Sequence, residues 1–294
     1  MAPKQLSIAS IAHPTADSNT GTTQKPLILS ASRRTDLPGF FPTECSDIIR
    51  NKAKRLRSRF LYGVVFWTKR PGAFLQNRPL RKLVEELENP LVQLTITGLG
   101  GTPLEPGIPP VQHTLAMLPE LVRLFKANPQ RVRWRFDPLL KQHNGIDDFN
   151  IIAEAVAAVG IQECTISFPT YFSLKGNLTS QFNLAGIPKW NNTEKADFVA
   201  ELTDAARQFN IGLKSCAQPE ICTINSAVQP AACIDAALIR SLHPNRLPLP
   251  LGKDSAQRKH CLCVASEDIG NYHEHRCGGG CVYCYSKAGG PQTG

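Results

Sequence analysis

The stretch PLILSAS at residues 26–32 is followed directly by Arg33, Arg34, Thr35 and Asp36, so a short apolar run ends in charged and hydroxyl side chains. Short runs rich in β-branched or aromatic residues and bounded by Gly, Pro or polar residues are typical of strands. Five more runs of this kind follow, at 62–69 (YGVVFWTK), 91–98 (LVQLTITG), 132–138 (VRWRFDP), 163–169 (ECTISFP) and 212–218 (GLKSCAQ). The sequence therefore predicts at least six strands.

Amphipathic stretches separate the six runs and predict helices at 43–57, 79–88, 111–127, 147–159, 193–209 and 232–241. Strands that alternate with helices indicate an α/β fold with a parallel sheet and right-handed crossovers. Such a sheet either stays open and doubly wound or closes into a partial or complete (β/α) barrel, TIM-like or radical-SAM-like. We favour the barrel, because polar residues recur where the strands end and a barrel gathers those ends at one mouth. No GxGxxG motif follows the first run.

Charged side chains at the predicted strand ends are candidates for the wall of an active site at that mouth. They are Arg33, Arg34 and Asp36 after the first run, Lys69 after the second, and Arg135 and Asp137 in the fourth. Arginine forks suit carboxylates and phosphates, which favours an anionic substrate. The alternative is that the arginines and aspartates only satisfy one another.

Three segments are expected along the chain. Residues 1–25 are polar, carry two lysines and contain no apolar core of a signal peptide, so they predict a disordered tail on a cytoplasmic protein. Residues 26–242 form the barrel domain. Residues 243–294 are punctuated by proline and rich in cysteine, so this segment must be held by ligands and by docking onto the barrel. No apolar run approaches the ~20 residues that cross a bilayer, so we expect no membrane contact.

Five of the ten cysteines lie between residues 261 and 284. Clustered cysteines in a reducing compartment more often bind metal than each other. The last three form the motif Cys277-Gly278-Gly279-Gly280-Cys281-Val282-Tyr283-Cys284. Three thiolates on one tight loop can hold three irons of a [4Fe–4S] cluster and leave the fourth iron open, and the glycines let backbone amides approach the cluster.

The C-x3-C-x2-C spacing, with Tyr283 before the last cysteine, resembles the signature of the radical S-adenosylmethionine superfamily, which is built on a partial (β/α) barrel. The resemblance implies that S-adenosylmethionine binds the open iron and yields a 5′-deoxyadenosyl radical. It also implies an electron donor such as a flavodoxin or ferredoxin, and a small-molecule or nucleotide-containing substrate. In that superfamily the cysteines follow the first strand. Here they lie near the end of the chain, which in a barrel can reach the same mouth.

A longer resemblance covers roughly residues 27–286. The chain is similar to an uncharacterised bacterial family, domain-of-unknown-function family 1848, which carries a C-terminal cysteine cluster like that of the radical enzymes. The resemblance rests on SASRRTDLP (30–38), FWTKRP (66–71), TITGLG (95–100), WRFDP (134–138), ISF (166–168), CID (233–235) and CLCVASEDIGNYHEHRCGGGCVYCYS (261–286).

Four other cysteines, Cys216, Cys233, Cys261 and Cys263, predict a second, fully ligated cluster, so the chain would hold one or two [4Fe–4S] clusters. Cys222 is a rival for one of these positions, whereas Cys45 and Cys164 are expected to be small buried hydrophobes. The alternative metal is zinc. The five C-terminal cysteines and the nearby His260, His273 and His275 could supply one or two tetrahedral sites.

The chain has 33 basic and 24 acidic residues, for a net charge of +9. Six of the basic side chains lie close together and are Arg50, Lys52, Lys54, Arg55, Arg57 and Arg59. Such a cluster is either a nucleic-acid footprint or the solvated face of a helix. The alternative to a radical enzyme is therefore a non-enzymatic protein, stapled by zinc or iron–sulfur, that binds nucleic acid through this stretch.

Overall fold

The computed structural model of the chain describes residues 24–56, 58–173, 176–255, 257–271 and 273–284. Within these ranges eight strands form one parallel sheet, ordered β10-β1-β2-β3-β4-β5-β8-β9. The strands are β1 (Lys25–Ala31), β2 (Arg59–Thr68), β3 (Pro90–Thr95), β4 (Val132–Phe136), β5 (Glu163–Ile166), β8 (Gly212–Cys216), β9 (Gln229–Ala231) and β10 (Glu267–Asp268). The predicted α/β fold with a parallel sheet is confirmed, and all six predicted strands are present. The predicted tail lies outside the described residues up to position 23.

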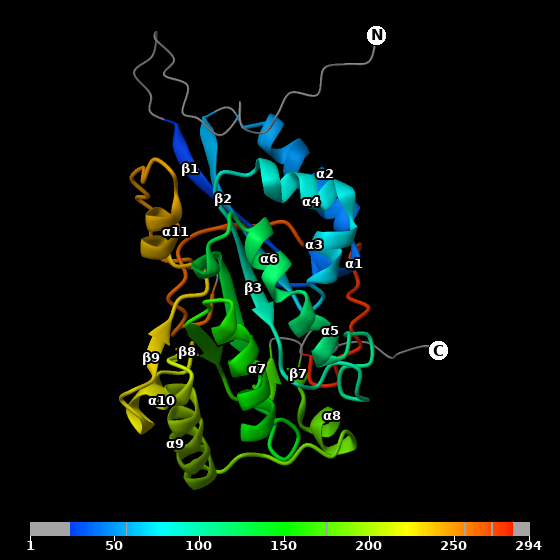
Figure 1. The fold of residues 1–294 in the computed structure, drawn as a ribbon, viewed down its shortest axis with the longest axis vertical. Helices are drawn as coiled ribbons and strands as arrows, with labels where there is room; N and C mark the ends of the chain where they lie inside the picture. Colours follow the sequence, from blue (N-terminus) through cyan, green and yellow to red (C-terminus); the bar gives the residue numbers. More distant parts are fainter. Residues whose placement is uncertain (1–23, 57, 174–175, 256, 272, 285–294) are drawn as a thin grey trace.

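Closure of the sheet into a barrel is not confirmed, because the sheet is open (Figure 1). Its edges are β9 and β10, which have three and two residues. Strands this short offer few backbone groups for a further ladder, and Pro230 in β9 has no N–H to donate. A second, two-stranded antiparallel sheet consists of β6 (Phe172–Ser173) and β7 (Gly176–Asn177).

Helices lie between the strands, as predicted. They are α1 (Leu37–Phe40), α2 (Pro42–Lys54), α3 (Gly72–Gln76), α4 (Arg78–Glu86), α5 (Val111–Ala116), α6 (Leu118–Leu124), α7 (Ile146–Ala158), α8 (Thr179–Leu184), α9 (Asn192–Gln208), α10 (Pro219–Ile224) and α11 (Ala236–Leu242). The single helix expected at 111–127 is two helices. Pro119 in the first turn of α6 lacks the N–H that would bond back to the Leu115 carbonyl, so the first helix ends before it.

The two faces of the sheet are covered differently. One face packs against α2, α4, α6, α7 and α9 and is apolar, with Leu29, Phe66 and Trp134 fully buried in it. The side chains that alternate with these, including Ile28 and Tyr62, pack against α11 and the segment that follows it. Because strand residues alternate between faces, the C-terminal segment serves as the second layer over part of the sheet.

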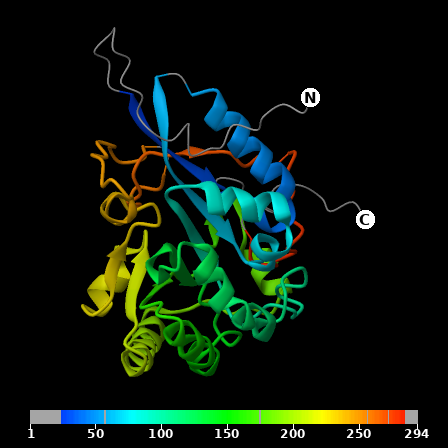
Figure 2. The same ribbon diagram turned by 45° about the horizontal axis from the view of Figure 1, so that its top comes forward.

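The C-terminal segment is docked by its backbone as well as by packing. Strand β10 pairs with β1 in parallel, with Glu267 opposite Leu29 and Asp268 opposite Ser30. Figure 2 shows this segment, in orange, beside the blue first strand. The segment that contains β10 is thereby brought to the carboxyl end of β1. No helix in the described part of the chain is long and apolar enough to cross a membrane.

Candidate metal centre

The three-cysteine motif forms a loop, residues 277–284, which we call the triad loop. It lies against the loop that follows β3. The Gly107 N–H donates to the Gly279 carbonyl oxygen at 3.0 Å, and the Val282 N–H donates to the Leu104 carbonyl oxygen at 3.0 Å. The loop after β3 thus supports the triad loop at the carboxyl end of the sheet.

Gly280 of the motif is required by its surroundings. It has a φ of +67°, and a Cβ there would lie 2.8 Å from Cγ of Pro106. A Cβ at Gly279 would be in ordinary contact with two thiols, 3.4 Å from Cys277 Sγ and 3.5 Å from Cys281 Sγ. The sulfurs of Cys277 and Cys281 therefore border the same space beside the Gly279 backbone.

Backbone amides and one cation surround the triad thiols. The Cys277 sulfur accepts hydrogen bonds from the backbone N–H groups of Gly279 and Asp36, although burial keeps the pKa of this thiol above its usual value. Burial raises the pKa of Cys281 to about 12, against the opposing charge of Lys69. All three thiols are close enough for their charges to interact. The environment combines an apolar wall with donors aimed at sulfur.

Beside the triad loop lies a buried ion pair. Lys69 Nζ donates to Glu105 Oε1 at 2.9 Å, and the same oxygen accepts from Thr97 Oγ1 at 2.6 Å and from the Tyr283 hydroxyl. Glu105 is 1% exposed. Burial alone would raise its pKa, but the charge and hydrogen bond of Lys69 hold it below the usual value. The Lys69 ammonium also lies 5.6 Å from the centre of the Tyr283 ring.

Glu105 is the site residue that the sequence analysis missed. It lies in the irregular loop between β3 and α5, which has no helical or strand period. An acidic residue within GGTPLEPG carries no pattern of its own. The available signal was that this loop follows a predicted strand, where functional side chains gather.

The other four predicted ligands also meet, and we call them the tetrad. Cys216 ends β8, Cys233 follows β9, and Cys261 and Cys263 come from the C-terminal segment. Sγ of Cys216 lies 3.4 Å from Sγ of Cys233. Cys233 is hydrogen-bonded in turn to Cys263, and Cys263 to Cys261. Four thiols from three separate segments thus form one contact chain.

Two polar groups outside the tetrad donate hydrogen bonds to its thiols. Arg135 Nη1 donates to Cys233 Sγ at 2.8 Å, and the Ile234 N–H donates to Cys263 Sγ at 3.3 Å. The hydrogen bond from Cys263 lowers the pKa of the Cys261 thiol to about 7.

Arg135 and Asp137 lie between the two cysteine groups. Asp137 accepts from Arg135 Nη2 and from the Ser167 hydroxyl. The Asp137 charge acts on Lys69 at one side and on Cys216 at the other. Of the predicted wall residues, Lys69, Arg135 and Asp137 are thus brought together.

The remaining wall candidates have other surroundings. Asp36 accepts from the backbone N–H groups of Lys69 at 2.8 Å and of Gly39 at 2.9 Å, so it joins the first two strand ends. The Arg33 guanidinium donates to Asp254 at 2.9 Å and therefore reaches the C-terminal segment. Arg34 is exposed.

All ten cysteines fall within the described residues, and all are free thiols. Cys45 and Cys164 are fully buried in the core, as predicted. Among the residues that the structure describes, no group of three or more His, Cys, Asp or Glu side chains is already arranged to hold a metal ion. Metal binding at either cysteine group would therefore require its thiols to rotate about a common centre.

Two alternatives from the sequence are a zinc site that uses the nearby histidines and a nucleic-acid surface on the basic stretch. His260 and His273 are exposed, and the His275 ring packs edge-on against Phe41 with 5.2 Å between centroids.

In the basic stretch, three cations pair within the chain. Arg50 pairs with Glu86 at 2.6 Å, whereas Lys52 and Arg59 pair with Glu267. Arg57 lies outside the described residues. These pairs reduce the positive field that a nucleic acid would meet.

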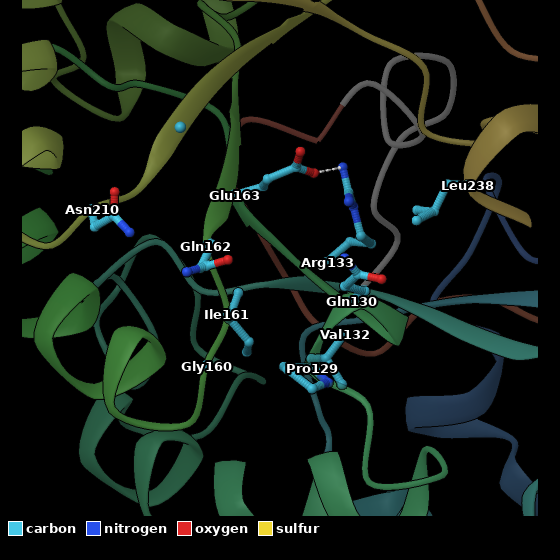
Figure 3. A pocket seen from close by; sticks show the side chains of 11 residues that line it. Pro129, Gln130, Val132, Arg133, Gly160, Ile161, Gln162, Glu163, Asn210 and Leu238 are labelled. Carbon is cyan, nitrogen blue, oxygen red and sulfur yellow. Dashed lines mark ion pairs between the residues drawn. The ribbon is translucent and has the colours of Figure 1, made fainter. Parts of the chain in front are cut away.

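A separate pocket of about 380 Å³ opens at the amino ends of β4, β5 and β8 (Figure 3). Glu163 in its wall pairs with Arg133 and, at 2.6 Å, with Lys214. Its two charged lining residues, Arg133 and Glu163, pair with each other, and it lies at the opposite ends of these strands from the tetrad. We place the candidate site at the carboxyl ends.

The fold and the site define an α/β protein with one parallel sheet and two cysteine groups at the strands' carboxyl ends. The family model described as domain of unknown function, DUF1848, matches residues 28–286. The chain therefore belongs to this family, as its sequence motifs predicted. No curated protein matches the sequence.

Similarity to solved structures is low. A proposed fructose-1,6-biphosphate aldolase from Coccidioides immitis is 12% identical, with a TM-score of 0.27 over 70% of this chain and 75% of that chain. The carboxyl transferase domain of Rhizobium etli pyruvate carboxylase is 12% identical, with a TM-score of 0.26 over 76% of this chain and 44% of that chain. This chain thus spans less than half of the carboxyl transferase chain. Likeness at this level carries no inference about function.

Proposed function

We propose that this protein is an iron–sulfur enzyme of the radical S-adenosylmethionine type, with a [4Fe–4S] cluster held by Cys277, Cys281 and Cys284. The observation that carries the proposal is the position of the triad loop. It lies at the carboxyl end of a parallel sheet, beside the buried Lys69–Glu105 pair. A loop that served only to staple the chain would have no need of a buried charge next to its thiols.

The residues present fit such a cluster. Gly279 leaves open the space between two thiols, where any larger side chain would stand against sulfur. Two backbone N–H groups donate to the Cys277 sulfur, and hydrogen bonds of this kind tune the potential of iron–sulfur clusters. The Lys69 ammonium offsets negative charge at Cys281. The sequential strand order from β1 to β9, with β10 beside β1, also supports a partial (β/α) barrel.

When bound, the cluster supplies one electron to S-adenosylmethionine and yields a carbon radical. The chain's own residues would bind and orient the reactants. Lys69 and Arg135 provide cations for carboxylate or phosphate groups, and their partners Glu105 and Asp137 hold them charged and fixed in direction. A small-molecule or nucleotide-containing substrate and a flavodoxin or ferredoxin donor, in the cytoplasm, complete the proposal.

The test is release of 5′-deoxyadenosine by the anaerobically reconstituted full chain with S-adenosylmethionine and dithionite. We expect Cys281→Ala to reduce release to the level without protein, because a cluster with two protein ligands is lost. The matched control is Cys222→Ala, which removes a half-buried thiol that belongs to neither cysteine group. Release that is equal in Cys281→Ala and wild type overturns the proposal.

A further inference from the structure

We propose that Cys216, Cys233, Cys261 and Cys263 form a second metal site, separate from the triad, that holds one tetrahedral ion of the zinc type. The proposal goes beyond the iron–sulfur function, because it assigns a different metal to a different set of ligands. It rests on the contacts among the four thiols and on their burial.

One distance between tetrad sulfurs is close to the distance expected around a single ion, although the four thiols must still rotate to share it. Zn–S bonds of about 2.3 Å in a tetrahedron place neighbouring sulfurs about 3.8 Å apart. Sγ of Cys216 and Sγ of Cys233 are 3.4 Å apart, and Cys263 is hydrogen-bonded to both Cys233 and Cys261. In a [4Fe–4S] cluster each thiolate binds a different iron, so four ligand sulfurs surround the cluster and cannot touch one another. The direct contact between the Cys216 and Cys233 sulfurs therefore favours one ion over a cluster.

The tetrad is closed, which distinguishes a structural from a catalytic site. It offers four cysteines, and four thiolates fill a tetrahedral coordination shell without an open position. Cys233 and Cys261 are 8% exposed and Cys263 is 3% exposed, so water has little access to these three thiols, whereas Cys216 is half-buried. All-thiolate tetrahedral sites select zinc or iron–sulfur chemistry over magnesium or calcium.

The surroundings also match the charge of such a site. Four thiolates and one divalent ion carry a net charge of −2. The Arg135 guanidinium donates to Cys233 at 2.8 Å and offsets part of that charge. The Ile234 N–H donates to Cys263 and holds its sulfur in place. Outer groups of this kind orient ligands in metal sites.

The location gives the ion a mechanical role. Its ligands join the end of β8, the loop after β9 and the C-terminal segment. An ion there would hold the C-terminal segment, which contains the triad loop, against the sheet. Strand β9 would remain a short edge strand. Since the segment has little regular structure, metal ligation would add to the packing that holds it on the sheet.

The experiment is zinc, iron and sulfide analysis of the full chain, purified anaerobically without chelators, in wild type, Cys263→Ser, Cys281→Ala and Cys222→Ser. We expect about one zinc per chain in wild type, in Cys281→Ala and in Cys222→Ser, and loss of most of it in Cys263→Ser. Because Cys281→Ala should lose only iron, failure of this proposal is distinct from failure of the iron–sulfur proposal.

A second measurement covers the case in which Cys263→Ser fails to fold. Cobalt(II) exchanged into the Cys281→Ala protein should give the intense visible bands of tetrahedral thiolate ligation. Zinc-free wild type, zinc retained in Cys263→Ser, or cobalt bands typical of octahedral oxygen ligation would each overturn the proposal.

Discussion

The two cysteine groups lie at the same end of one sheet but are built in different ways. The triad comes from eight consecutive residues, and its Cys277 sulfur lies against the backbone amides of Gly279 in the same loop and of Asp36. The tetrad is assembled from three segments, and its thiols contact one another directly. If the two groups bind metal as proposed, the local three-ligand motif leaves one coordination position open for chemistry, whereas the four-ligand set joins distant parts of the chain.

The largest expected effect is that of Glu105→Ala, which removes the buried carboxylate beside the triad loop. Glu105→Ala leaves the Lys69 ammonium and the Tyr283 hydroxyl without their shared carboxylate. Removal of one partner of a buried pair costs about 3–5 kcal/mol. We expect this loss in the free energy of unfolding from urea titration, together with loss of iron but not of zinc. The control Glu120→Ala removes an exposed partner of Arg81 and should cost below about 1 kcal/mol. Equal losses in the two variants would contradict the buried role of Glu105.

The next largest effect concerns Asp268, which lies in the segment between the tetrad and the triad. Asp268 accepts hydrogen bonds from the Ser32 hydroxyl at 2.5 Å, the Arg33 N–H at 2.8 Å and the Gly270 N–H at 3.0 Å. It therefore braces the segment between the tetrad and the triad. Asp268→Ala should cost about 2–3 kcal/mol, because hydrogen bonds to a charged group are among the stronger ones.

Because both groups depend on this segment, Asp268→Ala should also reduce iron and zinc content together. Limited proteolysis should cut the variant after residue 242 earlier than it cuts wild type. The exposed Asp204→Ala, which removes a partner of Arg207, serves as control. If only one metal falls, the segment is not a shared support.

A smaller effect is specific to the triad. In Gly279→Ala the new methyl group would stand 3.2 Å from Cδ1 of Ile108 and 3.4 Å from Cys277 Sγ. Such crowding typically costs about 1–3 kcal/mol. We expect reduced iron content and a shifted cluster spectrum, with zinc unchanged. Gly252→Ala is the matched control, because a Cβ at Gly252 meets nothing within 4 Å. Iron content that matches the control would show that the space beside Gly279 is not used.

The smallest effect lies away from both groups, at the amino ends of the strands. Burial would raise the pKa of Glu163, but the Lys214 hydrogen bond and the Arg133 charge hold it below the usual value. A folded-state pKa below the unfolded value of about 4.3 stabilises the protein above that pH, and this contribution is lost as pH falls through the folded pKa. Glu163→Gln should therefore lose less stability than wild type between about pH 5 and pH 3. The midpoints of urea unfolding, measured for both proteins across this pH range, test the prediction. Midpoints that change with pH in parallel in the two proteins would contradict the role of the Glu163 ion pairs.

Much of the fold could be predicted from local patterns. Phe66 and Leu29 belong to runs whose composition already indicates buried strands, and these became β2 and β1. The open sheet could not be predicted, because it depends on edge strands of two and three residues, which leave no periodic signal.

The residues of the candidate site also divide into those that could be predicted from the sequence and those that could not. The triad could be predicted from its spacing, and the tetrad ligands from their residue type. Glu105 could not, since its role arises from three contacts across the fold and not from its neighbours in sequence. The break before α6 could have been predicted, because Pro119 stands within the helical pattern.

The central claim, that the triad holds an iron–sulfur cluster, is tested most directly by iron and acid-labile sulfide analysis of Cys263→Ser with its visible spectrum, after anaerobic purification. With the tetrad impaired, a [4Fe–4S] cluster on Cys277, Cys281 and Cys284 predicts about four irons and four sulfides per chain and a brown protein. A colourless protein that holds zinc but neither iron nor sulfide would contradict the claim.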